Sequence, residues 1–414
     1  MDNTRDIVVI GAGIIGISTA LELLNRGQSV TVIDREGVAE GASKGNAGAF
    51  AFTEIVPLAT PGIMRKAPKW LLDPLGPLSV PASYALKIAP WMLRFWRASW
   101  QDRYLASLSA QSKLMDLSRA ALERQIKDVD GEGLMQREGQ ITLYETAAEF
   151  QASLPQWELR KAHGIPFELL ESPEAIAEIQ PGLSRQFTHA GYTPTWMNTV
   201  DPASWTRHLA AQFVARGGEI RVAEVTDLVS SESGVELTLP DGPLVAQKLV
   251  VSAGAYSHQL AARLGDRIPL ETERGYNTTL PEGAFDLRTH VTFGGHGFVL
   301  SRINGGVRVG GAVELGGLKL KPNYKRADTL LAKAKRFAPG LNTEGGTQWM
   351  GFRPSLPDSL PVIDRAPGAP RVIYAFGHGH LGLTQSAGTA ELVADLVMDR
   401  PSEFDMRPFR AARF

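Results

Sequence analysis

The chain of 414 residues contains no cysteine. This absence excludes disulfide bonds, thiolate metal sites, iron–sulfur clusters, and any flavin or haem attached through a cysteine. A basic excess is missing as well, because 43 Lys and Arg face 44 Asp and Glu, for a net charge of −1. Nucleic-acid-binding proteins normally show a clear positive excess, so we expect no nucleic-acid partner.

Long apolar runs are also absent. No stretch of about 18 uninterrupted apolar residues occurs, so we expect no membrane-spanning helix. The polar residues 1–6 do not follow the basic-then-apolar pattern of a secretory signal, and we expect a cytoplasmic protein. Glycine is abundant instead, with 42 residues, and glycine often marks turns or backbone that lies close to a ligand.

The first 34 residues carry the clearest pattern. Residues 7–10 are a short β-branched run, typical of a buried parallel strand, and they lead directly into Gly11-Ala12-Gly13-Ile14-Ile15-Gly16. A helical pattern follows, and residues 30–33 read as a second strand that ends at Asp34. Gly11 permits the tight turn, Gly13 lets a pyrophosphate approach the backbone, and Gly16 lets the helix pack on the strand. The sequence therefore predicts a dinucleotide-binding βαβ unit with phosphates at the helix N-terminus.

Asp34 narrows the choice of dinucleotide. An acidic side chain at this position accepts hydrogen bonds from a ribose and disfavours a 2′-phosphate, which argues against NADP and leaves FAD or NAD. The segment that follows, residues 35–48, is dominated by small residues, and Ser43 and Asn46 can hydrogen bond phosphate or ribityl oxygens. Taken alone, this segment is also compatible with a flexible loop.

A family resemblance decides between these alternatives. The glycine motif followed by Ala42-Ser43-x-x-Asn46-Ala47-Gly48 resembles the FAD-dependent D-amino acid oxidase and dehydrogenase family. The most similar branch is the small subunit of bacterial D-amino acid dehydrogenases, including D-hydroxyproline dehydrogenase-like members. The resemblance implies a noncovalent FAD held by Gly11, Gly13, Ile14, Ile15, Gly16, Asp34, Arg35, Ser43, Asn46, Ala47, Gly48, Val225, Gly254, Gly379, His380, Leu381, Gly382 and Thr384.

The glycine-rich turn at residues 377–382 feeds a second helix and offers another cluster of backbone N–H groups. In the resembling family this turn meets the edge of the flavin where negative charge develops on reduction. His378 and His380 lack the neighbouring carboxylates that a zinc site needs, so we expect no metal.

Arg353 is the best candidate for substrate binding. It stands between an aromatic residue and a proline in Gly351-Phe352-Arg353-Pro354, and its planar guanidinium can bind a carboxylate through two hydrogen bonds. The position matches the family's Gly-x-Arg-Pro element, whose arginine holds the substrate carboxylate. The resemblance also implies that Tyr276 faces the substrate and that Arg274 is either a second anion contact or a partner of Glu273.

The sequence predicts two kinds of β-sheet. The N-terminal strands read as parallel, whereas residues 289–311 contain short strands with an Asn304-Gly305 hairpin signal, typical of an antiparallel sheet. We expect an α/β fold in which a Rossmann-like FAD-binding domain of the glutathione reductase type carries an inserted α+β substrate domain. The predicted FAD-binding domain comprises residues 1–56, 199–264 and 346–414, and the substrate domain comprises residues 57–198 and 265–345.

The implied reaction is oxidation of a D-amino acid, with D-proline or hydroxy-D-proline among the candidates. Hydride leaves Cα for flavin N5, and electrons pass to a quinone or another acceptor. Two alternatives stay open: a sarcosine- or glycine-type amine oxidase that uses oxygen, and a flavin-bearing subunit of a larger dehydrogenase complex. The sequence leaves the oligomeric state undefined.

The stretch from Trp70 to Trp100 mixes tryptophan, arginine and proline. It is compatible with a helical cover on the substrate domain or with a helix that lies in a membrane interface. Because prolines break the amphipathic pattern, we expect at most loose attachment to the inner face of the membrane.

Overall fold

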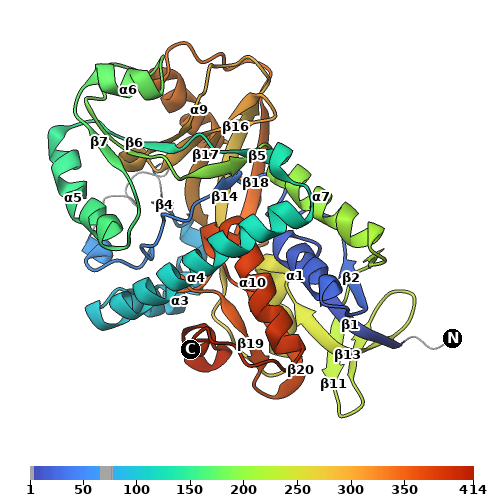
Figure 1. Ribbon diagram of the computed structural model, residues 1–414. Coiled ribbons are helices and arrows are strands. Elements are labelled where there is room, and N and C mark those ends of the chain that lie inside the picture. Colours follow the sequence, from blue (N-terminus) through green and yellow to red (C-terminus); the bar gives the residue numbers. More distant parts are fainter. Residues whose placement is uncertain (1–3, 66–75, 77) are drawn as a thin grey trace.

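A computed structural model describes residues 4–65, 76 and 78–414, so Trp70 lies outside the described residues. Figure 1 shows two large sheets, one in the lower right with α1 and α10 and one in the upper half with α5, α6 and α9. Within the described ranges, no helix combines the length and apolar character needed to cross a membrane.

The predicted βαβ unit is present. β1 (Thr4–Ile10) leads into α1 (Ile14–Asn25) and β2 (Val30–Asp34), and β1 and β2 pair in parallel. Gly11 has a φ of +108°, and a Cβ there would lie 2.4 Å from the Ser252 carbonyl oxygen. A Cβ at Gly16 would lie 1.8 Å from the Gly11 carbonyl oxygen. Only glycine therefore allows the turn and the close approach of α1 to β1.

The first sheet has a parallel centre with an antiparallel extension. β13 pairs with β1 along one edge; its other edge is shared, because residues 244–246 pair with β12 and residues 249–251 pair with β20. Helices α1, α4 and α10 pack on one another beside this sheet, and their apolar side chains form a common core. The remaining elements of this half are α4 (Gln101–Asp128), α7 (Pro202–Ala215), β10 (Glu219–Val222), β11 (Asp227–Ser230), β12 (Val235–Thr238), β13 (Leu244–Val251), α8 (Ser257–Arg263), β19 (Val362–Ala366), β20 (Ala369–Phe376) and α10 (Gly382–Val397).

The second sheet is mostly antiparallel, as predicted. Asn304 and Gly305 both have positive φ, 49° and 77°, and they join β16 to β17 in the predicted hairpin. Phe187, Phe293 and Phe337 lie in the core between this sheet and its helices. In sheet order the strands are β18 (Thr347–Ser355), β14 (Glu271–Leu280), β17 (Gly306–Leu315), β16 (Phe298–Ile303), β15 (His290–Phe293), β6 (Gln140–Tyr144), β8 (His189–Thr193) and β7 (Glu168–Leu170), with α5 (Ala147–Ala162), α6 (Pro173–Ile179) and α9 (Lys325–Phe337).

Two small features lie beside the two sheets. A three-stranded sheet joins β3 (Ala49–Phe50), β9 (Met197–Thr199) and β5 (Met135–Gln136). β4 (Leu78–Ser79) pairs with β17, and α3 (Ala85–Ala98) packs nearby against Leu315. Strand β18 pairs with β14 in the second sheet, although the boundary predicted at residue 346 put this segment in the FAD-binding domain.

Candidate active site

A cavity of about 900 Å³ is lined by residues from both sheets. Its walls come from the turn after β1, the segment after β2, strands β14, β17 and β18, and the turn before α10. The cavity thus touches both the dinucleotide-binding unit and the antiparallel sheet. Predicted site residues that line it are Gly11, Gly13, Ile14, Ile15, Asp34, Arg35, Ser43, Asn46, Ala47, Val225, Gly254, Tyr276, Arg353, Gly379, His380 and Gly382.

The glycine turn forms one end of the cavity. The backbone N–H of Ile14 donates to the Ser43 hydroxyl at 2.9 Å, so Ser43 caps the first turn of α1. A Cβ at Gly13 would lie 3.2 Å from the Ser43 hydroxyl oxygen, which is tighter than ordinary contact. Because a helix N-terminus and a bare backbone meet here, the residues fit a pyrophosphate.

Asp34 lies at the end of β2 and also lines the cavity. One carboxylate oxygen accepts from the Ala12 N–H at 2.8 Å, and the other accepts from Glu36 N and Gly37 N. The carboxylate therefore fixes the two turns on either side of the site, in a position that suits a ribose. Arg35 beside it stacks on the Tyr256 ring, 3.8 Å from the ring centre.

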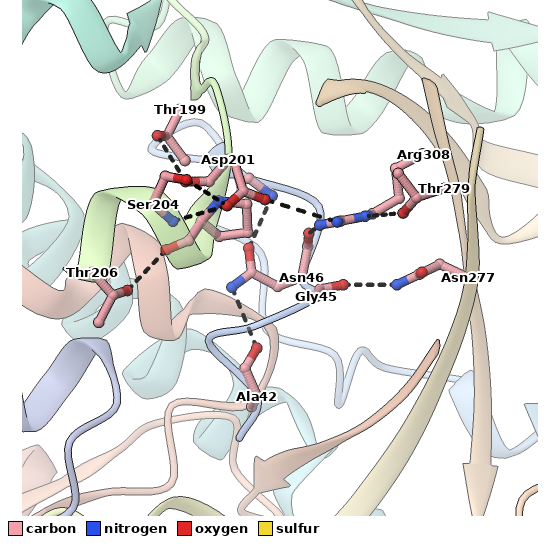
Figure 2. Close-up of polar contacts among 12 residues, drawn as sticks. Ala42, Gly45, Asn46, Thr199, Asp201, Ser204, Thr206, Asn277, Thr279 and Arg308 are labelled. Carbon is pink, nitrogen blue, oxygen red and sulfur yellow. Dashed lines mark hydrogen bonds and ion pairs between the residues drawn. The ribbon is translucent and has the colours of Figure 1, made fainter. Parts of the chain in front are cut away.

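The segment of residues 42–48 is held from several directions (Figure 2). The Asn46 side chain serves its own loop, since its amide nitrogen donates to Ala42 O and its oxygen accepts from Gly48 N at 2.9 Å. Asn277 on β14 donates to Gly45 O at 2.7 Å. Side-chain hydrogen bonds thus hold the loop in place, which argues against the alternative of a flexible loop.

Arg308 on β17 is a second clamp on this loop, and the sequence analysis missed it. Its guanidinium donates to Asn46 O at 2.5 Å and to the Thr279 hydroxyl at 2.8 Å, and it lies 3.9 Å from the Asp201 carboxylate (Figure 2). Burial lowers its pKa, and Asp201 opposes that effect. The sequence does contain a sign of this clamp, since one arginine stands within the apolar run of residues 307–313. A charged side chain buried in such a run requires polar partners.

Strand β14 sorts its side chains onto two faces, as alternation requires. Asn277 and Thr279 contact the loop and its clamp. Arg274 and Tyr276 point to the opposite face, where the Arg274 guanidinium donates to the carbonyl oxygens of Gly317 and Leu320 and the Tyr276 hydroxyl donates to Glu314 at 2.5 Å. Arg274 does not line the cavity, which corrects its prediction as an anion contact; its partner is Glu314, not Glu273.

Tyr276 is among the residues that line the cavity, although its side chain points to the face of β14 that carries Arg274 and its hydroxyl has protein partners there. It donates to Glu314 and accepts from Asn323 N at 3.1 Å. Burial raises the pKa of this hydroxyl, and Glu314 adds to the effect. The polar contacts of the Tyr276 hydroxyl are therefore with protein groups, and its role facing the substrate stays a prediction.

Arg353 enters the cavity from β18. Its guanidinium lies across Gly275 on the neighbouring strand, where a Cβ would come within 2.1 Å of a guanidinium nitrogen. One nitrogen donates to Ala312 O at 3.0 Å. Burial lowers its pKa and Glu273 opposes the shift, so a cation is held in partly desolvated surroundings that suit a carboxylate.

The carboxylate of Glu273 is the other charged group here. It is 4% exposed, it is in register with Arg353 across the two strands, and it bonds His380 Nε2 at 2.5 Å. Burial raises the pKa of Glu273, but His380 and Arg353 outweigh burial and hold it below its ordinary value. The sequence analysis named both residues without pairing them, because they are 107 positions apart.

Four predicted cofactor residues lie just outside the cavity lining. Gly16 serves the packing of α1, and the Thr384 hydroxyl accepts from Ala51 N at 2.9 Å and so ties α10 to the segment after β3. Gly48 has a φ of +68° and ends the 42–48 loop, and Leu381 packs against the α1 core. These four residues belong to the packing around the cavity and not to its surface.

Comparison with known proteins identifies the family to which the chain belongs. The sequence profile of the DAO family, described as FAD dependent oxidoreductase, matches residues 6–396. A D-amino-acid oxidase of Bradyrhizobium diazoefficiens is 34% identical, and a D-amino acid dehydrogenase of Rhizobium rhizogenes is 30% identical; coverage is 99–100% of each chain. Glycine oxidase from Geobacillus kaustophilus has the same fold, with a TM-score of 0.80 at 22% identity over 100% of this chain and 99% of that one.

Proposed function

Because this chain belongs to the DAO family of FAD-dependent oxidoreductases, we propose that it oxidises a D-amino acid at Cα. We also propose that the electrons pass to an acceptor other than oxygen, in line with the relatives named D-amino acid dehydrogenase. The observation that carries the proposal is Arg353, a partly desolvated guanidinium that lies across Gly275 and lines the cavity. A bidentate contact with an α-carboxylate satisfies such a group.

The cofactor fits the residues present. The glycine turn and Ser43 would hold the pyrophosphate, Asp34 would hold the ribose, and the turn at residues 377–382 would lie beside the ring system. Bound FAD supplies the acceptor for the hydride that leaves the substrate. Arg353 would fix the carboxylate.

The lining of the cavity supports an uncharged substrate side chain. Val299, Val313 and Trp349 contribute apolar surface from β16, β17 and β18. Glu54 also lines the cavity, but it is paired with Arg160 at 3.1 Å. D-Proline and hydroxy-D-proline fit this description and are the candidates we propose first.

Anaerobic bleaching of the flavin tests the proposal. The purified chain is mixed with a panel of D- and L-amino acids, sarcosine and glycine, and loss of flavin absorbance is followed. We expect the D-proline class to bleach the flavin and its L-enantiomers to leave it oxidised. Preference for sarcosine or glycine would point to an amine oxidase, and no bleaching by any compound would favour a subunit of a larger complex.

Activity in air tests whether oxygen is the electron acceptor. We propose a dehydrogenase that reacts poorly with oxygen and donates to a quinone. Stoichiometric hydrogen peroxide, formed as fast as an artificial dye is reduced, would contradict this part of the proposal.

Helix α3 supports loose attachment to a membrane surface, where a quinone is dissolved. Its inner face packs through Ile88 and Trp91, yet Leu86, Leu93 and Trp96 are 91%, 64% and 48% exposed on the outer face. The helix carries Lys and Arg but no acidic residue. Exposed apolar side chains flanked by cations complement an anionic bilayer.

A further inference from the structure

Glu273 and His380 form a contact to which the proposed function assigns no role. Glu273 comes from β14 and His380 from the short turn Gly379–Leu381 before α10, so the contact bridges the two halves of the molecule. Burying a carboxylate almost completely costs free energy unless positively charged or hydrogen-bonding groups lie next to it. The titratable groups that act on it are Arg353 and His380.

The contact fixes the tautomer of His380. Because Glu273 is held ionised, its oxygen accepts, and Nε2 of the imidazole carries the hydrogen. Nδ1 then keeps a lone pair, and no residue in the described part of the chain hydrogen bonds to it. The His380 side chain is 33% exposed and lines the cavity, so this nitrogen can be reached by a bound molecule.

The other titratable groups around the pair do not compete with His380 for a proton. Arg353 on β18 is a cation. His378 lies in the same turn, but it is buried against Thr389 at 3.0 Å, and burial lowers its pKa to about 3. Tyr276 points to the far face of β14 and bonds Glu314. Of these groups, His380 is the one that lines the cavity with a ring nitrogen not bonded to the protein.

We propose that His380, positioned by Glu273, accepts a proton from the ammonium group of a substrate whose carboxylate lies on Arg353. The N–H bond of the ammonium breaks, its electron pair stays on the nitrogen, and the proton moves to Nδ1. The free amine can then release the Cα hydrogen as hydride, because its lone pair forms the new C=N bond; the oxidised flavin that the site would hold is the acceptor of the hydride. Glu273 is a positioning residue, and it stabilises the imidazolium that results. This inference rests on the proposed function.

The test is the pH dependence of kcat/KM with an artificial dye, using the D-amino acid that bleaches the flavin fastest. With His380 as the acceptor, kcat/KM in the native enzyme rises with pH through an acidic limb that depends on this side chain. In His380→Asn we expect kcat/KM at pH 7.5 to fall ~10²-fold and to recover toward the pKa of the substrate amine, where solvent already provides the free amine.

Two further variants sharpen the result. Glu273→Gln keeps an acceptor but removes the charge, so we expect the acidic limb to move to lower pH. His296→Asn removes a histidine that pairs with Glu145 outside the cavity lining, and we expect an unchanged profile. Binding of pyrrole-2-carboxylate, which has no basic amine, is read from the flavin spectrum and should be equal in the native, His380 and His296 proteins.

The outcomes separate this inference from the proposed function. A His380→Asn enzyme whose kcat/KM profile overlays that of the native enzyme would overturn the role of His380. Loss of pyrrole-2-carboxylate binding together with activity would overturn it as well, because the histidine would then hold the structure or the carboxylate. Failure of every amino acid to bleach the native enzyme would instead overturn the proposed function itself.

Discussion

Arg353 and Gly275 depend on each other at the scale of single residues. The guanidinium can lie flat on β14 only because position 275 has no side chain. In Arg353→Lys the charge remains but the planar fork is lost. We expect a loss of about 1.5–3 kcal/mol in substrate binding, the range for hydrogen bonds to charged groups, with unchanged FAD content. KM and the flavin spectrum measure the two effects, and intact activity on amino acids would exclude Arg353 as the anchor.

Gly275→Ala tests the same geometry without touching the charge. The new methyl group would meet the guanidinium within 2.1 Å, so Arg353 must move. We expect weaker substrate binding than in the native enzyme, with FAD still bound. Gly133→Ala is the matched control, because a Cβ there meets nothing within 4 Å. Equal KM values in the two alanine variants would contradict the placement of Arg353.

Two buried histidines predict how stability changes with pH. Burial lowers the pKa of His290 and of His378 to about 3, whereas histidine in an unfolded chain titrates near about 6.5. The unfolded state therefore binds more protons than the native state between these values. The free energy of unfolding falls as pH drops through this window, by about 1.4 kcal/mol per pH unit for each histidine.

The pH dependence of the unfolding midpoint in His290→Gln measures this effect. We expect a flatter dependence than in the native protein between pH 6.5 and 4, because one proton fewer is taken up on unfolding. The comparison of the two proteins cancels the contribution of the carboxylates they share. Parallel curves would show that His290 is not held neutral.

At the scale of elements, α3 is apolar on two faces, and its outer face predicts reversible binding to lipid. Native protein should float with anionic vesicles at low salt and be released as salt rises, because salt screens the attraction of Lys87 and Arg94. Leu86→Glu combined with Leu93→Glu should abolish flotation. Val214→Glu combined with Val222→Glu alters exposed apolar residues elsewhere and should leave it unchanged. Equal flotation of both double variants would exclude α3 as the contact.

At the scale of the whole molecule, the cofactor is held without a bond to cysteine, because the chain has none. The walls of its site come from segments as distant as residues 11 and 382, which meet only in the folded chain. Unfolding should therefore release FAD. Acid precipitation is expected to leave yellow flavin in the supernatant, and flavin that stays in the pellet would indicate a covalent link through another residue type.

The sequence by itself determined the βαβ unit, the hairpin at Asn304-Gly305 and the position of Arg353 in a stiff local segment. These features depend on neighbours in the chain: periodicity, positive φ at glycine, and residues flanking a proline. The order of motifs along the chain was equally local, and it indicated the family.

Only the tertiary structure decided which side chains share the cavity. Alternation along β14 sends Arg274 and Tyr276 to the far face, and the choice of face depends on how the sheet packs, which no local pattern encodes. The pairing of Glu273 with His380 and the clamp of Arg308 on Asn46 join residues 107 and 262 positions apart. Burial creates the demand for such partners, and burial is a property of the folded chain.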